Sequence, residues 1–202
     1  MKMREPRWLY TALWGILRVS MSIWHPFTHI QGRDRIPADA CMMVANHSSM
    51  ADPIWVLLAL GPQRSTYIMA KKQLMDVPLL SGLLRWVGVF AVDRGNADIG
   101  AIKKALEVLK NGEKLLIFPE GTRVKTGKQV EAKTGAVMLA NRTAVPVVPI
   151  YISQKKRPFL PIRVIVGEPF HVTSASRRQT SAELEESTAA MMQIIYRLES
   201  GE

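Results

Sequence analysis

The chain has 202 residues, of which 48% are hydrophobic and 22% are charged. This length suits one well-cored domain and is too short for two ordinary domains plus a linker, and the composition excludes a disordered chain. The 27 Lys and Arg residues outnumber the 17 Asp and Glu residues, for a formal net charge of +10. We therefore expect one folded domain with an anionic partner, which is nucleic acid, a phospholipid surface or a phosphorylated substrate.

The first predicted element is an amino-terminal helix. Its apolar stretch from Trp8 to Trp24 is short for a bilayer span and has Arg18 in its middle, which disfavours a simple transmembrane helix. No small-residue cleavage site follows it, so removal as a signal peptide is not expected. On a helix, five small or polar residues form one narrow stripe, and Ser20 falls outside it: Thr11, Gly15, Arg18, Ser22 and His25.

The remaining wide face of this helix is apolar and aromatic, with Trp8, Leu9, Leu13, Ile16, Leu17 and Trp24. Such a face suits either burial in a membrane interface or packing on the protein's own core. Positive charges favour the first: Lys2, Arg4, Arg7 and Arg18. We therefore predict an amphipathic, membrane-associated helix over residues 1–27.

Short apolar runs then alternate with helical patterns over residues 28–202. The runs that indicate buried strands are 41–45, 65–70, 88–92, 114–118, 145–152 and 162–167. Helices are expected at 51–60, from about 97 to 111, and after Thr180, which has capping-box spacing to Glu183. This alternation predicts one α/β domain over 28–202, with a mostly parallel or mixed sheet flanked by helices.

Two basic segments lie between these elements, at residues 124–133 and 153–158. Charge runs of this kind are usually solvated, and we interpret both as surface loops.

His47 is the histidine with the strongest chemical context among the four in the chain. It follows a predicted strand, and Asp52 lies five positions later, near the start of a predicted helix. A turn at Ser48 and Ser49 can return this carboxylate to the imidazole, where it would fix the tautomer and orientation of the ring. The spacing therefore indicates general base catalysis, although a lone His near an Asp also suits a turn or a helix cap.

Two further clusters follow predicted strands. FPEGTR, at 118–123, places Glu120, exposed backbone N–H groups and Arg123 at the sheet edge where ligands bind in α/β folds. GVFAVDR, at 88–94, ends on Arg94 after another strand. Two arginines at neighbouring strand ends would form a clamp for a phosphate group.

Four blocks in this order resemble the phospholipid and glycerol acyltransferase family, typified by bacterial 1-acylglycerol-3-phosphate acyltransferase. They are NHSSMAD (46–52) for the NHxxxxD block, GVFAVDR (88–94) for GxxxxxR, FPEGTR (118–123) for FPEGTR, and VPVVPI (145–150) for the proline-containing block. KTGA at 133–136 also looks like the family's Lys-x-Gly-Ala segment. FPEGTR and the order of the four blocks are the most specific features. Val124 stands where many relatives have Ser.

The resemblance implies transfer of a fatty acyl group from an acyl-carrier-protein or coenzyme A thioester to the free sn-2 hydroxyl of 1-acyl-sn-glycerol 3-phosphate, giving phosphatidate. It implies no cofactor or metal, and a peripheral or monotopic position on the cytoplasmic face of the cell membrane. His47 would be the catalytic base and Asp52 its orienting partner. The acceptor-phosphate site would comprise Arg94, Glu120, Gly121, Thr122 and Arg123. Lys133 or nearby backbone N–H groups are candidate donors to the reaction's oxyanion.

Three alternatives stay open. One is a sibling activity, namely acylation of glycerol 3-phosphate or of another lysophospholipid. Another is a basic nucleic-acid-binding module, although the chain has no helix-turn-helix, zinc-finger or RNP pattern and we expect no nucleic-acid partner. The third is a metal-dependent hydrolase, for which His25, His29 and His171 lack ligand-like spacing. The single Cys41 excludes a disulfide framework and a cysteine metal cluster within one chain.

Overall fold

The structure is a computed structural model that describes residues 7–62, 66–78, 80–93, 98–124, 130–172 and 180–201. Within these residues, seven strands form one sheet in the order β1-β7-β6-β2-β5-β3-β4. The strands are β1 (Thr28–Gln31), β2 (Met42–Ala45), β3 (Tyr67–Lys71), β4 (Val89–Val92), β5 (Leu115–Ile117), β6 (Val147–Ile152) and β7 (Ile162–Val166). Neighbouring strands are parallel except β6 and β7, which are antiparallel. The predicted single α/β domain with a mixed sheet is confirmed.

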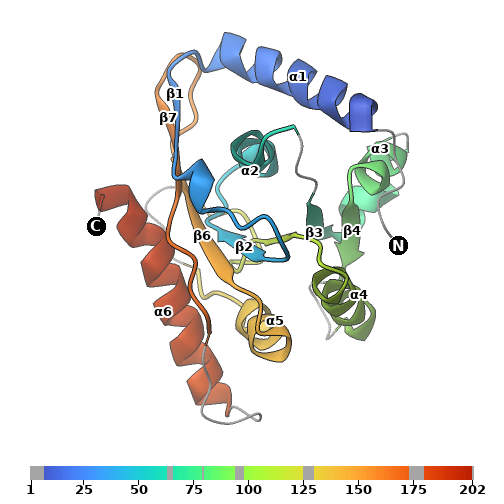
Figure 1. The fold of residues 1–202 in the computed structure, drawn as a ribbon, viewed down its shortest axis with the longest axis vertical. Coiled ribbons are helices and arrows are strands. Elements are labelled where there is room, and N and C mark those ends of the chain that lie inside the picture. Colours follow the sequence, from blue (N-terminus) through green and yellow to red (C-terminus); the bar gives the residue numbers. More distant parts are fainter. Residues whose placement is uncertain are drawn as a thin grey trace.

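Helices cover both faces of this sheet (Figure 1). They are α1 (Arg7–Trp24), α2 (Asp52–Leu60), α3 (Leu80–Trp86), α4 (Ile99–Lys110), α5 (Gly135–Thr143) and α6 (Ser181–Ser200), with short 3-10 turns η1 (Arg33–Arg35) and η2 (Lys72–Asp76). The capping box expected at Thr180 and Glu183 is present at the start of α6. Two core clusters result, one between the sheet and α2, and the other between the sheet and α4, α5 and α6.

Strand β2 shows why the sequence forms this layered core. Successive strand residues point to opposite faces, so Met43 and Ala45 join the core with α2, whereas Met42 and Val44 join the core with α4, α5 and α6. A strand buried on both faces requires a continuous apolar run, and all four residues are fully buried. Because β2, β5 and β6 run in parallel, the segments after them meet at one edge of the sheet.

Helix α1 lies across α2 at the periphery of the domain (Figure 1). The indole Nε1 of Trp14 donates a hydrogen bond to the Leu57 carbonyl at 3.1 Å. His25, assigned from the sequence to the polar stripe, instead contacts the Trp55 ring edge to face, with centroids 5.5 Å apart. The helix is therefore held by the domain core along one side. The division of the chain at residue 27 stays a prediction.

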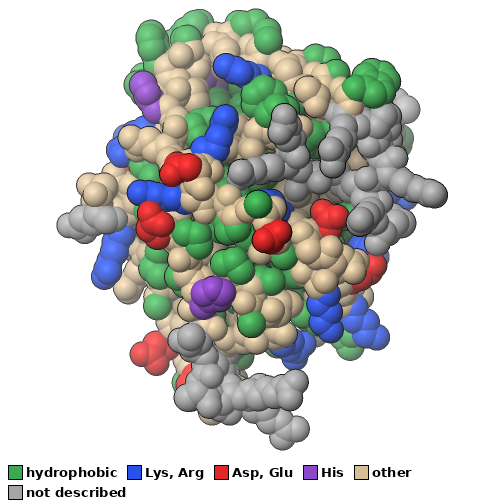
Figure 2. Space-filling model, in the orientation of Figure 1, with side chains coloured by type: hydrophobic (Ala, Val, Ile, Leu, Met, Phe, Trp, Pro, Cys, Tyr) green, Lys and Arg blue, Asp and Glu red, His purple; other side chains and the backbone are tan. Residues whose placement is uncertain are grey.

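The other side of α1 keeps large apolar residues in solvent. Trp8, Ile16 and Ile23 are each more than 60% exposed. Figure 2 shows hydrophobic side chains along the upper edge of the molecule, where Figure 1 places α1. Among the described helices, none combines the length and apolar character needed to cross a membrane.

Candidate active site

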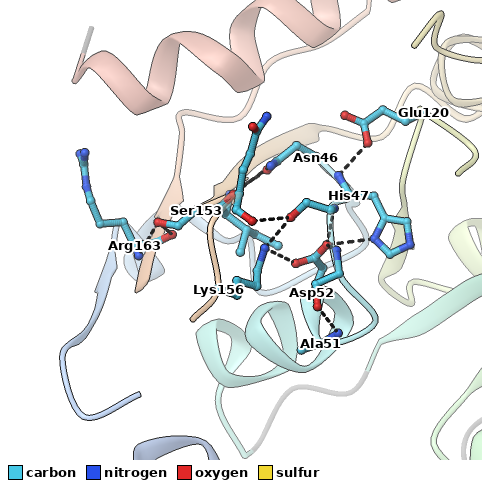
Figure 3. A network of polar contacts seen from close by, with 12 residues as sticks. Asn46, His47, Ala51, Asp52, Glu120, Ser153, Lys156 and Arg163 are labelled. Carbon is cyan, nitrogen blue, oxygen red and sulfur yellow. Dashed lines mark hydrogen bonds and ion pairs between the residues drawn. The ribbon is translucent and has the colours of Figure 1, made fainter. Parts of the chain in front are cut away.

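Asn46 fixes the point at which the chain leaves the sheet after β2. Its side-chain amide donates to the Ile152 carbonyl at 2.8 Å, and its carbonyl oxygen accepts from the Ile152 N–H at 2.7 Å. Both bonds are buried, and they join the end of β2 to the end of β6 (Figure 3). The next residue, His47, is thereby placed at the edge of the sheet where the strand ends meet.

His47 and Asp52 form a hydrogen-bonded pair at this edge. The Asp52 carboxylate oxygen Oδ2 lies 3.0 Å from His47 Nδ1 and also accepts the backbone N–H groups of Ser48 at 2.6 Å and Ser49 at 2.7 Å. Ser48 and Ser49 thus form the expected turn that returns Asp52, the first residue of α2, to the imidazole. Because an ionised carboxylate only accepts, Nδ1 carries the proton, and in a neutral imidazole the lone pair is then at Nε2.

The surroundings of Asp52 keep it ionised. Burial raises the pKa of this carboxyl group, but the hydrogen bond from His47, the charge of Lys156 and the N–H of Ser49 lower it by more, so the net pKa lies below its ordinary value. The residue is completely buried. An ionised, immobile carboxylate is what a neutral imidazole base requires as its partner.

The imidazole ring is held from a second direction. It stacks on Phe118, with ring centroids 4.3 Å apart and planes inclined by 26°. Phe118 directly follows β5, and His47 is 9% exposed. The ring therefore lies between an apolar surface and a carboxylate.

Glu120 holds the backbone of His47 in place. Its carboxylate accepts the His47 N–H at 2.8 Å and the Tyr196 hydroxyl of α6 at 2.5 Å. The Val124 N–H donates to the His47 carbonyl at 2.7 Å, so the turn after β5 contacts both peptide groups of His47. Burial raises the pKa of the Glu120 carboxyl, and the bonds from Tyr196 and His47 offset this rise only in part. The sequence assigned Glu120 to the acceptor-phosphate site, whereas the structure directs its carboxylate toward His47 and Tyr196.

The rest of the FPEGTR turn faces outward. Gly121 has φ +63°, a conformation that favours glycine, and a Cβ there would lie 3.2 Å from Lys133 Cγ. The Lys133 N–H donates to the Pro119 carbonyl at 2.7 Å, and the side chains of Thr122, Arg123 and Lys133 are exposed. These candidate acceptor-site residues therefore lie together at the rim of the site. Arg94 lies outside the described residues.

A pocket of about 320 Å³ adjoins this rim. Phe118, Gly121 and Lys133 line it on one side, and Met69, Ile102 and Leu139 give it an apolar lining between β3, α4 and α5. Asp98 also lines it and caps α4, accepting the Ala101 N–H at 2.9 Å. Apolar space beside a polar turn is suited to an amphiphilic ligand.

Two contacts of the site carry no local signal in the sequence. Tyr196 lies on a helix far along the chain and reaches Glu120 only through the packing of α6 on the sheet. Lys156 belongs to the segment interpreted as a solvated loop, yet its ammonium lies 2.7 Å from Asp52 Oδ1. Among the described residues, no group of three or more His, Cys, Asp or Glu is arranged to hold a metal ion.

The comparison with family models places the chain in the class of acyltransferases. The model of the Acyltransferase family matches residues 28–153, which is more than half of the chain, and the chain belongs to this family.

The names of individual relatives specify an acceptor, which the family name does not. The chain is 33% identical over 177 residues to the 1-acyl-sn-glycerol-3-phosphate acyltransferase of Bacillus subtilis, covering 85% of this chain and 87% of that enzyme. It is 36% identical over 140 residues to a chloroplastic 1-acyl-sn-glycerol-3-phosphate acyltransferase of Brassica napus, covering 66% of this chain but 40% of that protein. The matched region spans about half the length of several other curated relatives.

A solved structure extends the likeness to the whole fold. The 1-acyl-sn-glycerophosphate acyltransferase PlsC from Thermotoga maritima superimposes with a TM-score of 0.70 at 23% identity, covering 98% of this chain and 84% of that one.

Proposed function

We propose that this chain is a 1-acyl-sn-glycerol-3-phosphate acyltransferase, which moves a fatty acyl group from an acyl-carrier-protein or coenzyme A thioester to the sn-2 hydroxyl of lysophosphatidate. The observation that carries the proposal is the buried His47–Asp52 pair, in which Asp52 Oδ2 lies 3.0 Å from His47 Nδ1, so that a neutral imidazole has its lone pair at Nε2. The named relatives support this choice of acceptor.

The pair supplies a general base. His47 Nε2 removes the proton of the acceptor hydroxyl while the hydroxyl oxygen attacks the thioester carbonyl. The tetrahedral intermediate then collapses: the C–S bond breaks, the new C–O ester bond remains, and the imidazolium returns its proton to the leaving thiolate. Asp52 stabilises the transient imidazolium. The cycle balances without a covalent acyl-enzyme and without a cofactor or metal.

The exposed turn after β5 is the proposed acceptor-phosphate site. Arg123 and Thr122 offer donors there, Gly121 lets the ligand approach the backbone, and Arg94 is assigned to the same phosphate from the sequence. Lys133 or neighbouring N–H groups are the proposed donors to the oxyanion, a role that typically contributes about 3–4 kcal/mol.

A membrane-bound position on the cytoplasmic face, peripheral or monotopic, is part of the proposal, because the lysophosphatidate acceptor and the phosphatidate product are bilayer lipids. The exposed apolar side of α1 supports it. Phe159 (63% exposed) and Leu160 extend the same surface, since the Phe159 N–H donates to the Trp24 carbonyl at 2.8 Å. The net charge of +10 favours anionic phospholipid.

The activity is tested with the purified protein, lysophosphatidate or glycerol 3-phosphate as acceptor, and both thioester donors. Product should form preferentially with lysophosphatidate. Replacement of His47 by Ala should abolish transfer, whereas His171→Ala, at an exposed histidine away from the site, should retain it. More than a few per cent of the wild-type rate in His47→Ala would refute the assignment of the base.

Membrane attachment is tested by flotation with phosphatidylglycerol vesicles. A triple change in the full chain, Trp8→Ser with Ile16→Ser and Ile23→Ser, should reduce the bound fraction severalfold, because it removes apolar area from the interface. Ile99→Ser is the matched control, since Ile99 is 65% exposed but lies on α4. Equal flotation of the triple variant and the control would contradict attachment through α1.

A further inference from the structure

The connection between β6 and β7 contributes a buried cation to the active site. The Lys156 side chain is 7% exposed, although lysine is almost never buried without a partner. Its ammonium lies 2.7 Å from Asp52 Oδ1 and donates a hydrogen bond to the Ser48 hydroxyl at 2.6 Å. The Ser48 hydroxyl contacts the same connection again, at the Gln154 carbonyl, 3.4 Å away. Lys156 is thus fixed on both sides by residues of the His47–Asp52 turn.

The two oxygens of Asp52 differ in their partners. Oδ2 accepts from His47 and from two backbone N–H groups. Oδ1 is buried and has no hydrogen bond of good geometry in the part of the chain that the structure describes, so the nearby ammonium is its compensation. A buried charge without a partner is costly. Among the described residues, Lys156 is the group that compensates the charge on Asp52 Oδ1.

We propose that Lys156 is a positioning residue for acyl transfer, which holds the Asp52 carboxylate ionised and in place so that Asp52 can orient the His47 imidazole. The role rests on His47 being the base, as proposed above. Figure 3 shows Lys156 and the imidazole on opposite sides of the Asp52 carboxylate, so Lys156 acts on the ring through Asp52 and not by touching substrate.

The charges around His47 explain why a cation is useful there. The groups facing it are Asp52 from α2 and Glu120 from the turn after β5, and Tyr196 of α6 donates to Glu120. The Lys156 ammonium lies beside the Asp52 carboxylate, and its charge and hydrogen bond lower the pKa of that carboxyl group. Without Lys156, Asp52 would become protonated at a higher pH. A neutral Asp52 would orient the imidazole and stabilise the transient imidazolium less well.

The test compares rate–pH profiles of the full chain with lysophosphatidate in vesicles. In Lys156→Met, kcat at neutral pH should fall by about tenfold or more, and the acidic limb of the profile should move to higher pH by about half a unit or more. Lys156→Arg keeps the charge and should keep the limb in place. Lys155→Met is the matched control, since the adjacent Lys155 is exposed, and it should behave as wild type.

A second measurement separates positioning from substrate binding and from misfolding. If Lys156 acts through Asp52, replacing it should cost little further rate in an Asp52→Asn background. A Lys156 that instead binds the acceptor phosphate would raise KM for lysophosphatidate, with the same loss in both backgrounds, and that result would overturn the proposal. Thermal unfolding of each variant establishes that it is folded. If Lys156→Met does not fold, Lys156→Arg provides the test, because a shifted acidic limb in that variant would contradict the proposal.

The outcomes also distinguish this proposal from the proposed function. An inactive His47→Ala together with an unshifted, fully active Lys156→Met would refute the role of Lys156 alone. An active His47→Ala would refute the base itself.

Discussion

The two sides of the site are built differently. On the base side, His47, Asp52 and Glu120 are buried, and their contacts come from the turns after β2, β5 and β6 and from α6. On the acceptor side, Thr122, Arg123 and Lys133 are exposed side chains on a single rim. A general base must be oriented before the substrate arrives, whereas phosphate-binding side chains can be ordered by the substrate itself. Changes on the base side should therefore lower kcat, and changes on the acceptor side should raise KM.

The largest effect is expected on the base side, from Asp52→Asn. The amide can donate to Nδ1, which would place the imidazole proton on Nε2 and remove the lone pair that accepts the substrate proton. We expect kcat to fall by about 1,000- to 10,000-fold with little change in KM. Steady-state kinetics check this, and a main effect on KM would reverse the division between the two sides.

Substitutions of Glu120 test whether its buried hydrogen bonds, and not its charge, hold the residues of the base side in place. Glu120→Ala leaves the His47 N–H and the Tyr196 hydroxyl without their partner and should destabilise the protein by about 1–3 kcal/mol, with a clear loss of kcat. Glu120→Gln can accept from one group and donate to the other, and should be much milder. Urea unfolding compares the stability of Glu120→Ala and Glu120→Gln with that of wild type, and steady-state kinetics compare their kcat and KM. If both substitutions raise only KM, Glu120 belongs with the acceptor-site residues after all.

On the acceptor side, Arg123→Ala should raise KM for lysophosphatidate by about tenfold and leave kcat within a fewfold of wild type. The loss should be smaller for an acceptor without a phosphate, because the lost interaction is with that group. Arg142→Ala, at an exposed arginine on α5, is the control. A fall in kcat at unchanged KM would mean that Arg123 acts in the chemical step.

The smallest predicted effect concerns acid stability. The folded-state pKa of Asp52 lies below its unfolded value, so its stabilising contribution is present above the ordinary Asp pKa of about 3.9 and is lost as pH falls through the lower folded value. The melting temperatures of wild type and Asp52→Asn should therefore converge as pH falls below about 4. A difference that stays constant down to the lowest measurable pH would contradict the ionised, compensated state of Asp52.

The sequence predicts the central strands well because their residues are buried on both faces. The runs around β2, β5 and β6 are continuously apolar, and the helices at α2, α4 and α6 also occur where periodicity and caps indicate them. The sequence does not indicate strand β1, since THIQ alternates between half-buried and exposed residues at the edge of the sheet. It does not indicate helix α3 either, in which no residue is buried.

For the site, the sequence predicts contacts between residues that are close in the chain and does not predict contacts between distant ones. His47 and Asp52 are close in sequence, so a local turn suffices to predict their contact. Lys156 contacts Ser48 and Asp52 from more than a hundred residues away, and Tyr196 contacts Glu120 from 76 residues away. The segment QKKRP does not indicate that Lys156 is buried and Lys155 is exposed. Lys156 is buried because the folded chain places it against the Asp52 carboxylate, which is distant in sequence.

Asn46 has a consequence for how the chain can leave the sheet. Its side-chain amide presents one donor and one acceptor, the same pair that a peptide group presents, and both bind the peptide groups of Ile152. The side chain thus acts as the last rung of the ladder between β2 and β6. The main chain of His47 is released from pairing with β6 and is free to bind Glu120 and Val124 instead. An aspartate at position 46 would place an oxygen opposite the Ile152 carbonyl and would lose the hydrogen bond that the Asn46 amide donates.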